Sequence, residues 1–369
     1  MQPTPICRQE DSGGRAPDPV ATPGPIDAPT TRELIMHSDR KPLLSVRNLR
    51  TSFFQDEGIT KAVDGASFDV FPGKTLGIVG ESGCGKSVTA QSILRIVDRP
   101  GRIVAGEIFL TRTDGSQTDL VRLKANSREM RSIRGGDIGL IFQEPMTSFS
   151  PVHTVGAQLI EAVRLHTVVG AKEARLRAIE ALRSVGIPQP ERRIDEYSFE
   201  LSGGLRQRAM IAVALSCDPR LLIADEPTTA LDVTTQAQIL DLLRKIQRER
   251  AMAIMLITHN LGVVAEMADD VVVMYLGKVV EQGTVDAIFH DPKHPYTKAL
   301  LQSIPSIDSV PRLKLPTISG SIPHPFNRPT GCPFHPRCVS FIAGRCDIEE
   351  PLLQAVGDGR SASCFLYQR

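Results

Sequence analysis

The stretch Thr75–Ser87, which reads Thr-Leu-Gly-Ile-Val-Gly-Glu-Ser-Gly-Cys-Gly-Lys-Ser, decides the fold of this chain. Its first five residues form a compact apolar run of the kind expected for a buried strand. The remainder, Gly80–Ser87, matches the pattern G-x-x-x-x-G-K-[ST] in full, and a helical pattern over Ser87–Val97 follows it. A strand, a glycine-rich turn and a helix in this order distinguish a phosphate-binding loop from an ordinary turn.

The residue types of this loop suit a nucleotide phosphate. Glycines let successive backbone N–H groups point inward at phosphate oxygens, and the helix that follows adds the positive end of its dipole. We expect Lys86 to bind the β- and γ-phosphates and the Ser87 hydroxyl to ligate Mg²⁺. Cys84 precedes a helix N-terminus, where the pKa of a thiol is expected to fall. The predicted nucleotide contacts of the loop are Gly80, Glu81, Ser82, Gly83, Cys84, Gly85, Lys86, Ser87 and Val88.

Two further apolar runs end in residues that could act on a phosphate. Leu221–Ala224 leads into Asp225 and Glu226, and Ile254–Thr258 leads into His259. We expect Asp225 to bind Mg²⁺ directly or through water, and Glu226 to orient or deprotonate the attacking water. At the end of a neighbouring strand, His259 can reach the γ-phosphate.

The pattern between these runs predicts the fold class, α/β. Leu240, Leu243 and Ile246 recur at helical spacing within Asp232–Arg250, so strand, helix and strand form a βαβ unit. Outside this unit the sequence predicts antiparallel strands over Leu43–Phe54 and Ala66–Phe71, helices over Gly156–Leu165 and Lys172–Val185, and a terminal hairpin over Val271–Gln282.

The two ends of the chain differ from this core in composition. Residues 1–42 are rich in Pro, Gly, Asp and Thr, and we expect a disordered leader there. Residues 291–369 are Pro-rich in part and contain four of the seven cysteines. Lys plus Arg (43) against Asp plus Glu (42) leaves a net charge of +1, which does not favour a nucleic-acid partner. The sequence has no apolar run near the ~20 residues that cross a bilayer.

A third motif brings these observations together. Leu201–Arg208 reads Leu-Ser-Gly-Gly-Leu-Arg-Gln-Arg, and by itself its serine predicts only a helix N-cap. Combined with the phosphate loop and Asp225-Glu226, it resembles the signature of the ATP-binding-cassette (ABC) ATPases over residues 43–283. The resemblance implies a P-loop NTPase of ABC-ATPase type with an antiparallel β subdomain and a helical subdomain at about 147–197. The ATPase domain would span 43–290, and a small Cys-containing extension would span 291–369.

The family pattern also implies a head-to-tail pair of cassettes. ATP is then held by the phosphate loop of one cassette and by the equivalents of Ser202, Gly203 and Gly204 in the other. Residues that match further family positions are Gln143, for Mg²⁺ and the attacking water, Asp232, in the loop that crosses the dimer interface, and Phe53, which would stack on adenine with Phe54 as the alternative. The implied catalytic residues are Glu226, His259, Gln143 and Lys86.

Three segments indicate a branch of this family. Glu144–Pro151, His294–Leu300 and Gly331–Cys338 resemble the ATPases of oligopeptide and dipeptide importers. The resemblance implies an ATP-hydrolysing subunit that powers peptide import from the cytoplasmic face of the inner membrane. Its partners would be a second ABC ATPase subunit (a related paralogue or an identical copy), two membrane permease subunits and, indirectly, an extracytoplasmic solute-binding protein. A soluble ABC ATPase, an iron- or redox-regulated ATPase and a nickel-chelate importer are the alternatives.

The C-terminal cysteines predict a second kind of site. Cys332, Cys338, Cys346 and Cys364 supply four thiolates, enough for a [4Fe–4S] cluster or a tetrahedral zinc ion. Their spacing lacks C-x₂-C, which weakens the zinc interpretation. Some members of the importer branch that the chain resembles carry an iron–sulfur cluster at matching positions, so a cluster is the first expectation. Zinc and unligated thiols remain open.

Overall fold

The computed structural model describes residues 41–144, 148–229, 231–304, 318–324, 326–357 and 359–368. The predicted disordered leader, apart from its last two residues, lies outside these ranges. So do residues 145–147, where the helical subdomain was expected to begin.

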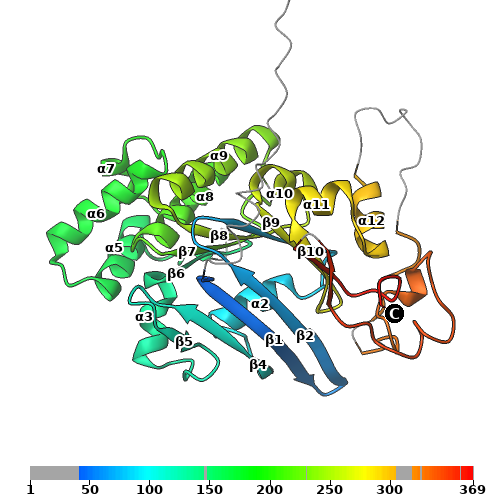
Figure 1. The fold of residues 1–369 in the computed structure, drawn as a ribbon. Coiled ribbons are helices and arrows are strands. Elements are labelled where there is room, and N and C mark those ends of the chain that lie inside the picture. Colours follow the sequence, from blue (N-terminus) through cyan, green and yellow to red (C-terminus); the bar gives the residue numbers. More distant parts are fainter. Residues whose placement is uncertain are drawn as a thin grey trace, which may run out of the picture. The chain divides into compact units, whose positions relative to one another are not determined.

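The centre of the fold is an eight-stranded sheet with the order β11-β12-β10-β9-β3-β8-β7-β6 (Figure 1). Its middle strands are parallel, and every residue of β3, β7 and β8 is buried, as expected where helices cover both faces. The parallel strands are β3 (Thr75–Val79), β6 (Ile138–Ile141), β7 (Leu221–Asp225), β8 (Ala253–Ile257) and β9 (Asp270–Tyr275). The predicted α/β class is confirmed.

The predicted βαβ unit and hairpin are both present. Helix α9 (Val233–Arg250) connects β7 to β8, which pair in parallel. Strand β10 (Lys278–Thr284) pairs with β9 in antiparallel register, as expected for the hairpin.

A second, antiparallel sheet has the order β2-β1-β4-β5. Its strands are β1 (Leu44–Gln55), β2 (Gly58–Val70), β4 (Gly101–Thr111) and β5 (Gln117–Asp119). Strand β2 starts well before the predicted Ala66, because Gln55 pairs with Gly58 and the hairpin closes through only two residues. The amino-terminal half of β2 alternates buried or half-buried with exposed side chains, so it carries no continuous apolar run.

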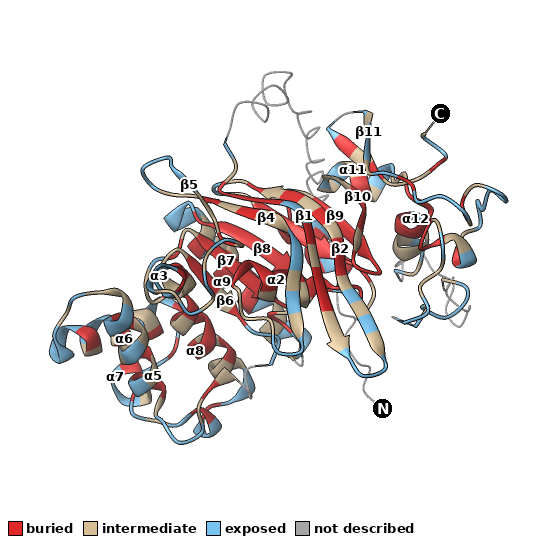
Figure 2. Cartoon of the chain, turned by 90° about the horizontal axis from the view of Figure 1, so that it is seen from below, coloured by how far each residue is buried: buried red, intermediate tan, exposed pale blue. Residues whose placement is uncertain are grey.

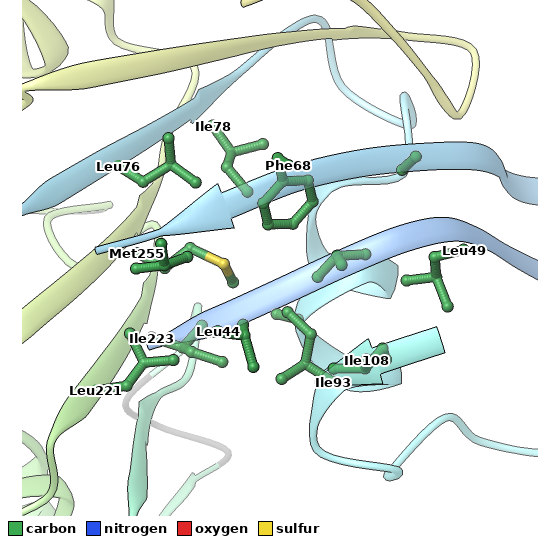
Figure 3. Packing of buried hydrophobic residues seen from close by; sticks show 14 of the residues in the cluster. Leu44, Leu49, Phe68, Leu76, Ile78, Ile93, Ile108, Leu221, Ile223 and Met255 are labelled. Carbon is green, nitrogen blue, oxygen red and sulfur yellow. The ribbon is translucent and has the colours of Figure 1, made fainter. Parts of the chain in front are cut away.

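Helix α2 (Lys86–Ile93) packs in the core that joins the two sheets. Figure 3 shows Ile93 near Leu44 and Ile108 of the antiparallel sheet, with Ile78 and Met255 of the parallel strands on the other side of this cluster. The helix is shorter than the predicted Ser87–Val97. It ends because Arg95 adopts a left-handed conformation and the Ile96 N–H donates to the Gln91 carbonyl, a Schellman-type terminus.

The helical region lies beside β6 and β7. Helices α5 and α6 confirm the two predicted helices, and their buried residues share one apolar cluster with α8 and β7. In Figure 2, exposed residues gather on the outer turns of α6 and α7, and buried residues fill the neighbouring strands. The elements are α3 (Arg128–Gly136), α5 (Val155–His166), α6 (Ala171–Ser184), α7 (Pro190–Arg193), the 3₁₀ turn Ser198–Glu200 and α8 (Gly203–Leu215).

The C-terminal part is continuous with the main sheet. Strand β12 (Arg360–Ala362) pairs with β10, and β11 (Gln354–Gly357) pairs with β12. The helices before them are α10 (Leu261–Met267), α11 (Val285–His290) and α12 (Pro295–Gln302). Among the helices of the described ranges, none is both long and apolar enough to cross a membrane.

Candidate active site

The phosphate loop connects β3 to α2 and requires glycine at two positions for packing reasons. A Cβ on Gly80 would lie 2.2 Å from the Met274 carbonyl oxygen, and one on Gly85 would lie 2.2 Å from the Ala62 carbonyl oxygen. Both glycines also have a positive φ. The loop is therefore pressed against neighbouring backbone on its inner side. The sequence motif, which was interpreted only through phosphate binding, did not indicate these contacts.

Lys86 lies under the loop with only 6% of its surface exposed. Its Nζ donates to the carbonyl oxygens of Gly80 at 2.8 Å and Glu81 at 3.2 Å. The following residue, Ser87, donates its hydroxyl to Asp225 Oδ1 at 3.1 Å. The structure thus brings the loop and the end of β7 together, as the sequence predicted.

The residues assigned to Mg²⁺ fit that ion chemically. A hydroxyl and a carboxylate in contact are the hard oxygen ligands that magnesium takes, and it keeps several waters besides. Burial raises the pKa of the Asp225 carboxyl, since its negative charge is removed from water. A cation bound here would supply the compensating charge that the buried carboxylate lacks.

The side chain of Glu226 contacts residues that follow two neighbouring strands. Its Oε1 lies 3.1 Å from His259 Nδ1, and its Oε2 accepts from Gln143 Nε2 at 3.3 Å. Gln143 follows β6, Glu226 follows β7 and His259 follows β8, and parallel neighbours end at the same edge of a sheet. All three residues were predicted from the sequence, and the fold places them in one cluster.

Thr229 is a member of this cluster that the sequence reasoning missed. Its Oγ1 donates to Glu226 Oε2 at 2.8 Å. Burial alone would raise the pKa of Glu226, but the hydrogen bonds from Thr229 and His259, together with the charges of His259 and Lys86, outweigh it and the pKa is lowered. The carboxylate is therefore ionised at neutral pH. A hydroxyl residue three positions after the glutamate was the available signal.

The backbone at Glu226 is also unusual, with a φ of 48° in the left-handed region. Such a conformation is uncommon for a residue with a side chain and concentrates at functional sites. It is held because the Glu226 N–H donates to the Ile257 carbonyl at 2.8 Å.

The Ser-Gly-Gly motif lies at the N-terminus of α8. Ser202 caps this helix by accepting from the Leu205 N–H, which confirms the N-cap expected from sequence alone. Asp232 caps α9 in the same way through the Thr235 N–H at 2.9 Å. The two helix ends are adjacent, since a Cβ on Gly204 would lie 2.9 Å from Thr235 Cγ2. Ser202 and Gly203 are exposed, and in the described part of the chain no hydrogen bond joins them to the phosphate loop.

The predicted adenine contact, Phe53, is half-buried beside Gly101. The alternative, Phe54, has one ring face covered by the Arg102 guanidinium, 4.1 Å from the ring centroid. Phe53 therefore stays the first choice of the prediction. Val88, at the end of the predicted set, packs against the core that joins the two sheets.

The expectation of a lowered pKa for Cys84 is wrong. The residue is 3% exposed, and burial raises the pKa of its thiol more strongly than the Lys86 charge lowers it. The Cys84 sulfur lies behind the loop, 2.7 Å from the position of a Cβ on Gly80. Desolvation of the thiolate consequently outweighs the helix dipole.

The four C-terminal cysteines are near one another. The Cys332 N–H donates to the Cys346 carbonyl at 2.8 Å. Burial, with a smaller contribution from the charges of Cys346, Cys364 and Cys338, raises the pKa of Cys332 to about 12. Within the described ranges, however, no three His, Cys, Asp or Glu side chains are placed to hold a metal ion. The geometry does not support the predicted [4Fe–4S] cluster or a zinc ion.

Comparisons with known proteins extend these findings. A family model described as ABC transporter matches residues 63–229, and one described as oligopeptide/dipeptide transporter, C-terminal region, matches residues 280–346. A Brucella melitensis protein that carries the name of a peptide import ATP-binding protein is 49% identical over 335 residues, covering 89% of this chain and 98% of that protein. A peptide ABC transporter ATP-binding protein named for Sinorhizobium fredii is 49% identical over 88% of this chain and 94% of its own length.

Solved structures match the cassette part. The dimeric structure of MJ0796, a bacterial ABC transporter cassette, is 25% identical with a TM-score of 0.57, covering 66% of this chain and 98% of that one. The structure of cbiO1 from Clostridium perfringens, part of an ABC transporter complex, is 28% identical with a TM-score of 0.56, covering 68% of this chain and 91% of that one.

Proposed function

Because this chain belongs to the ABC transporter ATPases, in the group that carries the oligopeptide/dipeptide transporter C-terminal region, we propose that it hydrolyses ATP to power peptide import through a membrane permease. The observation that carries the proposal is the cluster of Glu226, Gln143 and His259 at the sheet edge where the phosphate loop also begins. Relatives named for peptide import, matched over nearly their whole length, supply the substrate class.

The side chains divide the work of hydrolysis as follows. Lys86 leaves the carbonyl oxygens of Gly80 and Glu81 and binds the β- and γ-phosphates. Ser87 and Asp225 would hold Mg²⁺, which when bound would neutralise the charge that develops on the phosphate oxygens. The ionised Glu226 orients the attacking water and accepts its proton.

His259 and Gln143 act beside this carboxylate. His259 contacts Glu226 through Nδ1, so its other ring nitrogen is available to the γ-phosphate. Gln143 donates to the opposite carboxylate oxygen, and its amide oxygen is available to the magnesium ion or the water.

A second cassette completes the site. The exposed Ser202 and Gly203 begin a helix whose free N–H groups and dipole suit a γ-phosphate held by another chain. A dimeric structure among the matched cassettes supports the same arrangement. The second cassette is a related paralogue or an identical copy, and Asp232 lies in the loop that crosses between the two.

The remaining partners are two membrane permease subunits and, indirectly, an extracytoplasmic solute-binding protein. The helical region exposes apolar side chains on α5 and α6, among them Leu165 and Leu176, which suit contact with a permease. The protein then works on the cytoplasmic face of the inner membrane, and nucleic acid is not a partner. Nickel chelates, or an ATPase not coupled to transport, are the alternatives.

We expect cells that lack this protein to lose ATP-dependent uptake of a labelled di- or oligopeptide, and to regain it when the unchanged chain is supplied. Nickel uptake measured in the same cells separates the alternative substrate. The control is a chain with Lys245→Ala, an exposed residue of α9 whose one ion pair in the described part of the chain is with Glu249 at 3.8 Å, which should restore uptake fully. Unchanged peptide uptake without the protein would reject peptide import.

A [4Fe–4S] cluster on Cys332, Cys338, Cys346 and Cys364 is a separate proposal. It is supported by the closeness of the four thiols, whose charges act on one another, but not by ligand geometry in the described ranges. Protein purified without oxygen should then contain about four iron atoms per chain and absorb visible light. Protein that contains neither iron nor zinc and retains full ATPase activity would leave the cysteines as ordinary thiols.

A further inference from the structure

An arginine of the C-terminal part contacts the phosphate loop directly. Arg337 ends a short 3₁₀ turn, His335–Arg337, and its two terminal nitrogens donate to the two carboxylate oxygens of Glu81 at 2.8 and 3.0 Å. This is the bidentate geometry in which an arginine and a carboxylate interact most strongly. The contact joins residues that are 256 positions apart in the sequence.

The guanidinium of Arg337 is held from several sides. Its Nε donates to the Ser319 carbonyl at 3.1 Å, and one terminal nitrogen also donates to the Tyr275 hydroxyl at 3.4 Å. Its central carbon lies 5.8 Å from the ring centroid of Tyr275 and 6.0 Å from that of Phe334. Only 4% of the side chain is exposed. Arg337 is therefore a buried cation with a single orientation.

Glu81 is held at its backbone as well. Its N–H donates to the Tyr296 hydroxyl at 2.9 Å, and Tyr296 packs against both Tyr275 and Phe334. The carbonyl oxygen of the same residue accepts from Lys86 Nζ. The Cys84 N–H donates to the same carbonyl at 3.3 Å. Within the described ranges, the remaining hydrogen bonds of Glu81 come from Tyr296 of α12 and from Arg337 of the C-terminal part.

The charge of Glu81 matters because its loop receives a triphosphate. A carboxylate in this loop repels the phosphate charges, and like charges repel more strongly near a protein surface than in bulk water. Arg337 cancels this charge through an ion pair that is mostly removed from solvent, so salt screens it little.

We propose that Arg337 is a positioning residue for nucleotide binding, which neutralises and holds Glu81 so that the phosphate loop can accept ATP. ATP binding then depends on the C-terminal part being in place against the loop. The inference rests on the proposed function only in taking ATP as the ligand of this loop. It assigns to the C-terminal part a role at the nucleotide site, in addition to any metal that the cysteines hold.

The test uses the full chain and ATP titration without Mg²⁺, so that hydrolysis does not interfere. Arg337→Ala should weaken ATP binding about tenfold, and in the presence of Mg²⁺ it should raise KM by a similar factor while kcat changes little. Arg337→Lys keeps the positive charge, so its ATP affinity should lie between that of the unchanged chain and that of Arg337→Ala. The matched control is Arg345→Ala, which removes another arginine of the same region, stacked 4.5 Å from the centroid of the Phe365 ring. The control should bind ATP normally.

A second substitution separates charge neutralisation from mere docking. Adding Glu81→Gln to Arg337→Ala removes the uncompensated carboxylate and should recover most of the lost ATP affinity. If Arg337 only docks the C-terminal part, the double variant stays as weak as the single one, and the proposal is wrong. Normal ATP affinity in Arg337→Ala would also overturn it. Failure of the unchanged chain to bind ATP would instead reject the proposed function, and this inference with it.

Discussion

Replacing Glu226 with glutamine should reduce ATP turnover about 100- to 10,000-fold while leaving ATP binding intact. The amide keeps the size of the side chain and can still accept a hydrogen bond, but it cannot take a proton from water. The lowered pKa of Glu226 means that the carboxylate is charged at neutral pH, so the substitution also removes one negative charge beside the γ-phosphate. ATP should therefore accumulate unhydrolysed between two cassettes.

The measurements are steady-state phosphate release and size-exclusion chromatography with ATP and Mg²⁺. The variant, with the companion cassette present, should elute as an ATP-dependent pair. Glu249→Gln is the control, because Glu249 is an exposed residue of the adjoining helix α9. If Glu226→Gln turns over ATP within a few fold of the unchanged chain, Glu226 is not the base. Absence of any pair would contradict the shared site.

Replacing Lys86 with alanine should weaken ATP binding by about 100-fold or more and abolish measurable turnover. Its ammonium group is the mobile cation of the loop, and losing a buried charge from a charge pair costs roughly 2–5 kcal/mol. The fold should survive, since within the described ranges the hydrogen bonds of the Lys86 ammonium go to two backbone carbonyls and the Cys84 sulfur.

Binding is measured by titration with a fluorescent ATP analogue, and folding by thermal melting. Lys74→Ala is the matched control, since that lysine directly precedes β3 and its ammonium group forms a partly exposed pair with Asp269. If Lys86→Ala binds ATP with nearly the affinity of the unchanged chain, the backbone of the loop is sufficient for ATP binding and the prediction is wrong.

A feature of this protein is predictable from sequence when the residues that form it lie close together along the chain. The helix caps Ser202 and Asp232 were predictable, because each accepts from an N–H three residues ahead. The boundaries of α2 were less so, since a left-handed arginine ends that helix without a glycine. Glu226 and His259 could be named because each follows a recognisable apolar strand, whereas Gln143 was named from the family resemblance alone.

Local pattern by itself determined the phosphate loop, the buried parallel strands and the helix between β7 and β8. These depend on periodicity and on interactions within a few residues, which the order of amino acids contains directly. Only the tertiary structure decided that Cys84 is a buried thiol and that Arg337 holds Glu81. Burial and ion pairs over such separations depend on how the strands stack and which surfaces meet. The order of amino acids within a short window does not show which distant surfaces will meet.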